Sequence, residues 1–115
     1  MKNLHLSIQG LLLFLFFTNT SYSQINVSVT GNTNTSPNLA VSYTYLNDAL
    51  TALNAVTSMS GAVTLTCNAG SETAPSATGF TLGSASLNPV LSATNTISIV
   101  ASGTVTLNAA VGAST

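Results

Sequence analysis

The sequence predicts a mainly β fold with a single α-helix, preceded by an N-terminal segment that is removed on export. Three observations lead to this prediction. Apolar and polar residues alternate with a period of two over most of the chain, one stretch has the period of a helix, and clusters of Gly, Ser, Asn and Pro separate the alternating stretches. Ser and Thr alternate with small or branched apolar residues, a composition that suggests coils of a stacked sheet.

The start of the chain has the order of properties that is typical of a secretory signal peptide. One cation, Lys2, precedes the apolar run 11–17, which is much shorter than the roughly 20 apolar residues of a membrane-spanning helix. The small residues Ser21 and Ser23 occupy the two positions that a signal peptidase inspects, so cleavage is predicted between Ser23 and Gln24. We therefore expect residues 1–23 to be removed and the mature chain to be secreted or on the cell surface, with no membrane anchor.

The first mature segment, residues 24–42, is predicted to be a short strand followed by a linker. Ile25, Val27 and Val29 alternate with polar residues, as in a strand with one buried face. The next stretch, 31–38, has a turn-forming composition and contains Pro37, which cannot donate a hydrogen bond to a strand ladder.

One helix is predicted between Thr44 and Thr57, where the period changes. Thr44 or Asn47 can cap its N-terminus, Asp48 favours the positive end of the helix dipole, and Gly61 follows as a stop signal. We expect the helix to lie over the end of a sheet and to bury the apolar residues of one face, which are Leu46, Ala49, Leu50, Leu53 and Val56.

Short strands are predicted after Gly61, separated by turn-rich stretches at 68–79 and 83–95. Cys67 is the only thiol, so it has no internal disulfide partner, and we expect it to be a small core side chain. The predicted strands are Val63–Cys67, Phe80–Leu82, Ile97–Ile99 and Val105–Leu107.

The charged residues exclude several classes of function. Lys2 is the only basic residue and His5 the only histidine, and both leave with the signal peptide. A nucleic-acid surface or an attachment to anionic lipid needs Lys and Arg, so we expect no nucleic-acid partner. A Ser or Cys nucleophile would lack a neighbouring base, and one thiol with two carboxylates is a poor zinc site.

No catalytic residue, cofactor or metal ligand is therefore predicted. Asp48 and Glu72 are the two carboxylates, and a pair of this kind for glycoside hydrolysis is formally open. The more ordinary interpretation is that both are solvated surface groups, Asp48 in the helix and Glu72 in a turn.

Several segments together resemble the start of a class of large secreted surface proteins of Bacteroidetes-type bacteria. These segments are Tyr43–Asn54 with Gly61–Leu65, then Ala69–Pro75 with Gly79 and Phe80, and finally Thr94–Ile99. In that class a helix with a Leu, Ala and Asn pattern caps a right-handed parallel β-helix, also called a β-solenoid. The resemblance implies that residues 43–115 are a capping helix and the first coils of such a β-helix.

The same resemblance implies a longer protein with a C-terminal sorting domain read by the type IX secretion system. On this interpretation the chain is a truncated N-terminal portion, because residues 109–115 carry no capping element.

Two functions are left open. The first is a non-catalytic structural or adhesive role on the cell surface, with glycans or neighbouring surface proteins as partners. Tyr43, Tyr45 and Phe80 could stack on sugar rings, although a strand aromatic is more often part of the core. The alternative is the N-terminal piece of a polysaccharide-degrading β-helix enzyme whose catalytic residues lie beyond Thr115.

Overall fold

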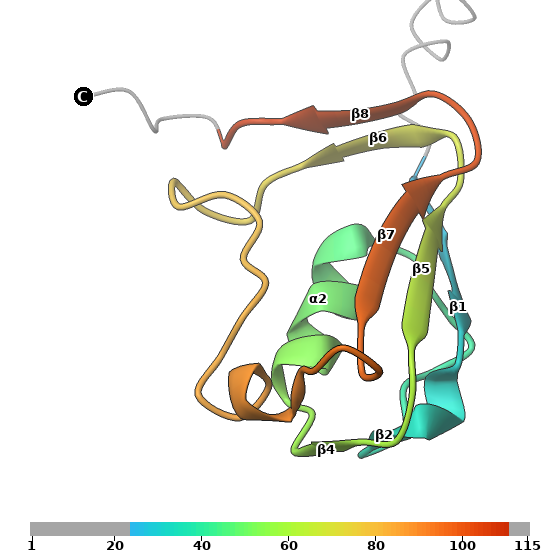
Figure 1. Cartoon of the computed structure of the whole chain (residues 1–115). Coiled ribbons are helices and arrows are strands. Elements are labelled where there is room, and N and C mark those ends of the chain that lie inside the picture. The colour runs from blue at the N-terminus through green and yellow to red at the C-terminus, as the bar shows by residue number, and fades with distance from the viewer. Residues whose placement is uncertain (1–23, 111–115) are drawn as a thin grey trace, which may run out of the picture.

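The computed structural model describes residues 24–110. The predicted signal peptide, residues 1–23, lies outside this range, and so does Ser23 of the predicted cleavage site. The described part is mainly β with one α-helix, as predicted, and Figure 1 shows the arrangement. None of its helices is long and apolar enough to cross a membrane. The elements are β1 (Val27–Thr30), η1 (Asn32–Asn34), β2 (Thr35–Ser36), β3 (Ser42–Tyr43), α2 (Leu46–Asn54), β4 (Ser58–Met59), β5 (Val63–Cys67), β6 (Gly70–Thr73), η2 (Asn88–Val90), β7 (Ile97–Ala101) and β8 (Val105–Asn108).

The strands form one four-stranded sheet and two small ones. The larger sheet has the order β3-β1-β5-β7, and the others pair β2 with β4 and β6 with β8. β1 runs antiparallel to both β3 and β5. The pairs β5 with β7 and β6 with β8 are both parallel. Parallel strands need a long connection. Residues 74–96, between β6 and β7, are part of the connection for both parallel pairs.

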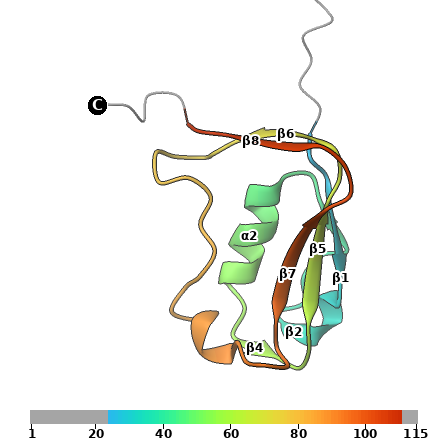
Figure 2. The same cartoon turned by 45° about the horizontal axis from the view of Figure 1, so that its top comes forward.

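The chain turns the same corner twice, once after β5 and once after β7, as Figures 1 and 2 show. The backbone of one corner bonds to the other: Ser102 N donates to Cys67 O at 2.9 Å and Gly70 N donates to Thr104 O at 3.0 Å. A Cβ atom at position 70 would collide with the carbonyl oxygen of Gln24, so glycine is required at the corner between β5 and β6.

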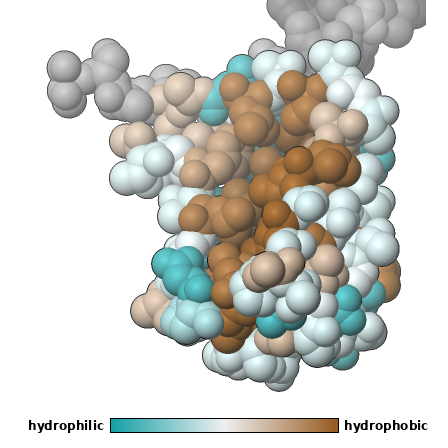
Figure 3. Space-filling model, viewed as in Figure 1, coloured by the Kyte–Doolittle hydropathy of each residue, from teal (hydrophilic) through white to brown (hydrophobic). Residues whose placement is uncertain are grey.

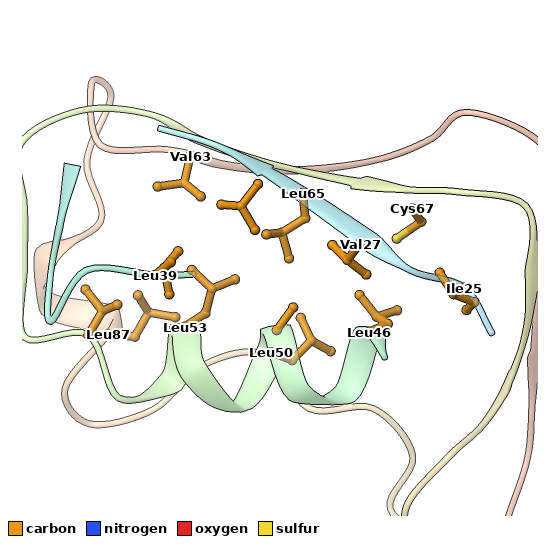
Figure 4. Close-up of a cluster of buried hydrophobic side chains, with 13 residues drawn as sticks. Ile25, Val27, Leu39, Leu46, Leu50, Leu53, Val63, Leu65, Cys67 and Leu87 are labelled. Carbon is orange, nitrogen blue, oxygen red and sulfur yellow. The ribbon is translucent and has the colours of Figure 1, made fainter. Parts of the chain in front are cut away.

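The core lies between α2 and the inner face of the larger sheet, and Figure 4 shows the facing side chains. The apolar face of α2 is buried as predicted, and the inward residues of β1 and β5 face it. Each large aliphatic side chain buried in this way stabilises the fold by about 1.5–3 kcal/mol. The largest fully buried side chains are Ile25, Leu53, Leu65, Leu87, Val27, Val56 and Val63.

Two strand assignments differ from the sequence-based prediction. Gly70–Thr73 is strand β6, although its composition indicates a turn, because it pairs along its length with β8. Phe80–Leu82, predicted as a strand, forms none. Its backbone instead bonds to the end of α2, where Asn54 Nδ2 donates to Thr81 O at 3.0 Å.

The predicted linker and the predicted helix ends also differ. The stretch 31–38 contains η1 and strand β2, which pairs with β4, so it is more structured than a linker. α2 begins at Leu46 and ends at Asn54, shorter at both ends than the predicted 44–57. It ends before Gly61 because the last turn already closes at Ala55: Ala55 N donates to Ala52 O at 3.2 Å, and Val56 N donates to Leu53 O at 3.0 Å.

Candidate functional site

Glu72 caps the N-terminus of α2 from a neighbouring strand. Its Oε2 accepts a hydrogen bond from Leu46 N, with a donor–acceptor distance of 2.6 Å, and its Oε1 accepts one from Asn47 N at 2.9 Å. A carboxylate at this position satisfies unpaired N–H groups and complements the positive end of the helix dipole. Both oxygens of Glu72 therefore accept hydrogen bonds from the backbone.

This arrangement corrects two sequence-based expectations. The N-cap residue is Tyr45, whose side chain makes no capping hydrogen bond, so neither Thr44 nor Asn47 caps the helix. Glu72 is also buried, with 8% of its surface exposed, and lies in β6 rather than in a solvated turn. No local sequence pattern predicts this contact, because the partners are 25 and 26 residues apart.

Asp48 lies in the first turn of α2, as predicted, and is exposed. The fold brings it to the same cavity as Glu72, so the two carboxylates of residues 24–110 lie in one site. Figures 1 and 2 show the paired strands β6 and β8 running past the N-terminal end of α2. This position explains why a helix residue and a strand residue line one cavity.

The cavity has a volume of about 650 Å³, and Tyr45 is the only aromatic residue among the described residues that line it. Gln24 Nε2 donates a hydrogen bond to Tyr45 Oη at 3.0 Å, which holds the ring at the rim. On the strand side, Asn108 Nδ2 donates to Ser71 Oγ at 2.9 Å. Most of the described lining residues have polar side chains: Gln24, Tyr45, Asn47, Asp48, Ser71, Glu72, Thr73, Pro75, Asn108 and Ala109.

The other two aromatic candidates lie elsewhere. Tyr43 is half-buried, and its hydroxyl accepts a hydrogen bond from Ala40 N at 3.0 Å. Phe80 is also half-buried and packs against the hydrophobic core. Tyr45, with 40% of its surface exposed, is therefore the one member of the predicted trio that lines the cavity.

Cys67 is a buried core residue, as predicted, and is a free thiol. Burial raises the pKa of its thiol, and the nearby charge of Glu72 raises the pKa further. Both effects keep the sulfur protonated and poorly nucleophilic. Within residues 24–110, no three His, Cys, Asp or Glu side chains are grouped so as to hold a metal ion.

A second feature, which we call the open end, is formed by the apolar residues of β7 and β8. By register, Ile99 stacks on Leu65 and Leu107 stacks on Glu72. Leu65 is 0% exposed, whereas Ile99 is 44% exposed and Leu107 is 50% exposed. Figure 3 shows apolar residues gathered on the face where β7 lies. Side chains that continue the buried rows of β5 and β6 are thus exposed, because no other described residue covers them.

Comparisons of the chain with protein-family models, with curated protein sequences and with solved structures found no match. The functional interpretation therefore depends on the geometry described above.

Proposed function

We propose that this chain provides the capped first coils of a parallel β-helix in an exported surface protein, where its role is structural or adhesive and not catalytic. The observation that carries the proposal is the repeated corner. Val63 pairs with Ile97 and Gly70 pairs with Val105, so the second pair of strands follows the first by 34 and 35 residues in parallel register. Stacking of successive coils in this way is how solenoid proteins grow.

The two sides of this stack differ in a way that supports a cap on one side only. On the side of β5 opposite to β7, β1 pairs with β5 in antiparallel orientation, and β3 pairs with the other edge of β1. α2 covers the inner face of this sheet. We call β1, β3 and α2 the cap. An antiparallel strand breaks the coil repeat, so the stack cannot continue past the cap. By pairing with β5, β1 also protects the edge of that strand.

The open end supports growth in the other direction. β7 is the last strand of its sheet among the described residues, and its inward row continues that of β5. It contains no proline, glycine or charged residue that would prevent another strand from pairing with it. A further coil would cover Ile99 and Leu107, which are exposed among the described residues.

A non-catalytic role is supported by the chemistry of the cavity. Glu72 has both oxygens engaged with backbone N–H groups, which leaves Asp48 as the solvent-facing carboxylate. Retaining and inverting glycoside hydrolysis both use two carboxyl groups that act on the substrate. Residues 24–110 also contain no Lys, Arg or His to serve in another mechanism.

The test of the open end uses two neighbouring residues on opposite faces of β7, in the exported protein purified from its own cells. In Ile99→Lys the new charge would lie beneath the next coil, and we expect a loss of about 3 kcal/mol in the free energy of unfolding. Val100→Lys, the matched control, points to the other face, and we expect a change within about 0.5 kcal/mol. Urea denaturation measures both, and an Ile99→Lys variant as stable as the control would contradict the proposal.

The gene sequence beyond codon 115 tests which chain supplies the next coil. We expect an open reading frame that continues with alternating strands and turn clusters. A stop codon directly after Thr115 would leave only a second copy to cover the open end, and would overturn the proposal of a longer β-helix.

A further inference from the structure

The cavity beside the N-terminus of α2 has a chemistry that a structural cap does not require. We propose that it binds a neutral carbohydrate, with the Tyr45 ring stacked on the sugar and Asp48 accepting hydrogen bonds from its hydroxyl groups. This inference does not depend on a third coil, because it uses only described residues of the cavity, which lie between Gln24 and Ala109.

Charge selects against anionic ligands. Asp48 and Glu72 both line the cavity, and no Lys, Arg or His occurs in residues 24–110 to balance them. A phosphate, sulfate or uronate would meet like charges at short range, which is unfavourable. An uncharged polyhydroxylated ligand avoids this cost and can use the carboxylate as an acceptor.

Tyr45 supplies the apolar platform. Tyr45 is 40% exposed and lines the cavity, so part of its side chain is accessible to a ligand. Its hydroxyl already accepts a hydrogen bond from Gln24 Nε2 at 3.0 Å, which restricts the ring before a ligand arrives. A pre-positioned Tyr offers a large contact area at a low entropic cost, and it leaves the hydroxyl proton free to donate.

Polar side chains on two walls of the cavity supply both donors and acceptors. Asp48 and Asn47 come from α2, and Ser71 and Asn108 come from β6 and β8. The bond from Asn108 Nδ2 to Ser71 Oγ uses one of the two amide protons of Asn108 and leaves its carbonyl oxygen as an acceptor. Neighbouring donors and acceptors of this kind match the paired hydroxyl groups of a sugar. The volume of about 650 Å³ lies within the ordinary range of small-molecule sites.

The experiment is an NMR titration of the isotope-labelled exported protein with maltose, cellobiose, laminaribiose and chitobiose as neutral probes and with digalacturonate as an anionic probe. We expect at least one neutral disaccharide to shift the amide signals of Tyr45, Asp48 and Asn108, with a dissociation constant on the order of 1 mM. Digalacturonate should bind at least tenfold more weakly.

Three variants complete the test. Tyr45→Ala and Asp48→Ala should each weaken the binding of the same disaccharide at least tenfold, whereas Ser28→Ala, on the outer face of β1, should leave it unchanged. Amide spectra of each variant verify that the fold is retained. The proposal is overturned if no neutral probe shifts these signals, if digalacturonate binds as well as the neutral probes, or if Asp48→Ala binds as tightly as the parent. None of these results affects the β-helix proposal, which the Ile99 and Val100 variants test separately.

Discussion

Glu72 joins the start of α2 to strand β6 through a single side chain. Its two hydrogen bonds, at 2.6 and 2.9 Å, fix the helix against the strand that follows the first corner. A charged acceptor that bonds to backbone N–H groups away from solvent contributes more than an exposed cap. The contact therefore stabilises both the helix and the orientation of β6.

Replacing Glu72 should destabilise the fold markedly. We expect Glu72→Ala to lower the free energy of unfolding by about 2 kcal/mol, because it leaves the N–H groups of Leu46 and Asn47 without their acceptor. Asp48→Ala is the matched control, since this exposed carboxylate interacts only with the helix dipole and should cost about 0.5 kcal/mol. Urea denaturation measures both variants, and equal costs would show that Glu72 is not the cap.

Cys67 should make stability fall at high pH. Its pKa is raised above the ordinary value of 9.0 by burial and by the charge of Glu72. Below that value the thiol is protonated in both states, so its contribution is fully present. Above it the unfolded chain ionises while the folded thiol keeps its proton, so the contribution is lost as the pH rises through the folded pKa.

The measurement compares the parent with Cys67→Ala by urea denaturation from pH 7 to pH 10. The parent should lose stability relative to the variant only above about pH 9. A constant difference over the whole range would mean that the thiol ionises equally in the folded and unfolded chains.

At the scale of elements, the long connection 74–96 is fastened to the end of α2 by Asn54. The side chain donates to Thr81 O at 3.0 Å and accepts from Gly83 N at 2.8 Å. The backbone oxygen of Asn54 also accepts a hydrogen bond from Ser84 Oγ at 2.7 Å. This connection buries Leu87, so its attachment closes one side of the core.

Loss of the Asn54 side chain should loosen the connection locally. We expect Asn54→Ala to speed hydrogen exchange at the amide of Gly83 about fivefold, which corresponds to about 1 kcal/mol for the lost hydrogen bond. Thr51→Ala is the control, because the Thr51 hydroxyl donates only within the helix, to Asn47 O at 2.8 Å. If both variants exchange at the same rate, Asn54 does not hold the connection.

The elements also show where sequence-based prediction succeeds. The strands at 63–67, 97–101 and 105–108 and the buried face of α2 follow from local periodicity, so the sequence predicts them well. β6 has no apolar residue within Gly70–Thr73, and only pairing with β8, about 35 residues later, makes it a strand. The cavity is unpredictable for the same reason, since Gln24, Asp48 and Asn108 meet only after the corners have stacked.

At the scale of the whole molecule, the proposed export has a direct chemical consequence at Gln24. We expect mass spectrometry of the exported protein to find Gln24, or its cyclised form, at the N-terminus. Cleavage there would also remove Lys2 and His5, and residues 24–115 carry no basic side chain. An intact Met1 on exported material would contradict the cleavage prediction.

The asymmetry between the cap and the open end also gives the chain a direction of folding. The cap lies nearer the N-terminus and would leave an export channel first, so it can fold before later residues arrive. β5 and β6 would then serve as a template on which β7 and β8 dock after closing a loop of about 34 residues. Each added coil would repeat that short closure on a preformed edge, so the time needed to fold should rise in proportion to the number of coils, without a single large kinetic barrier.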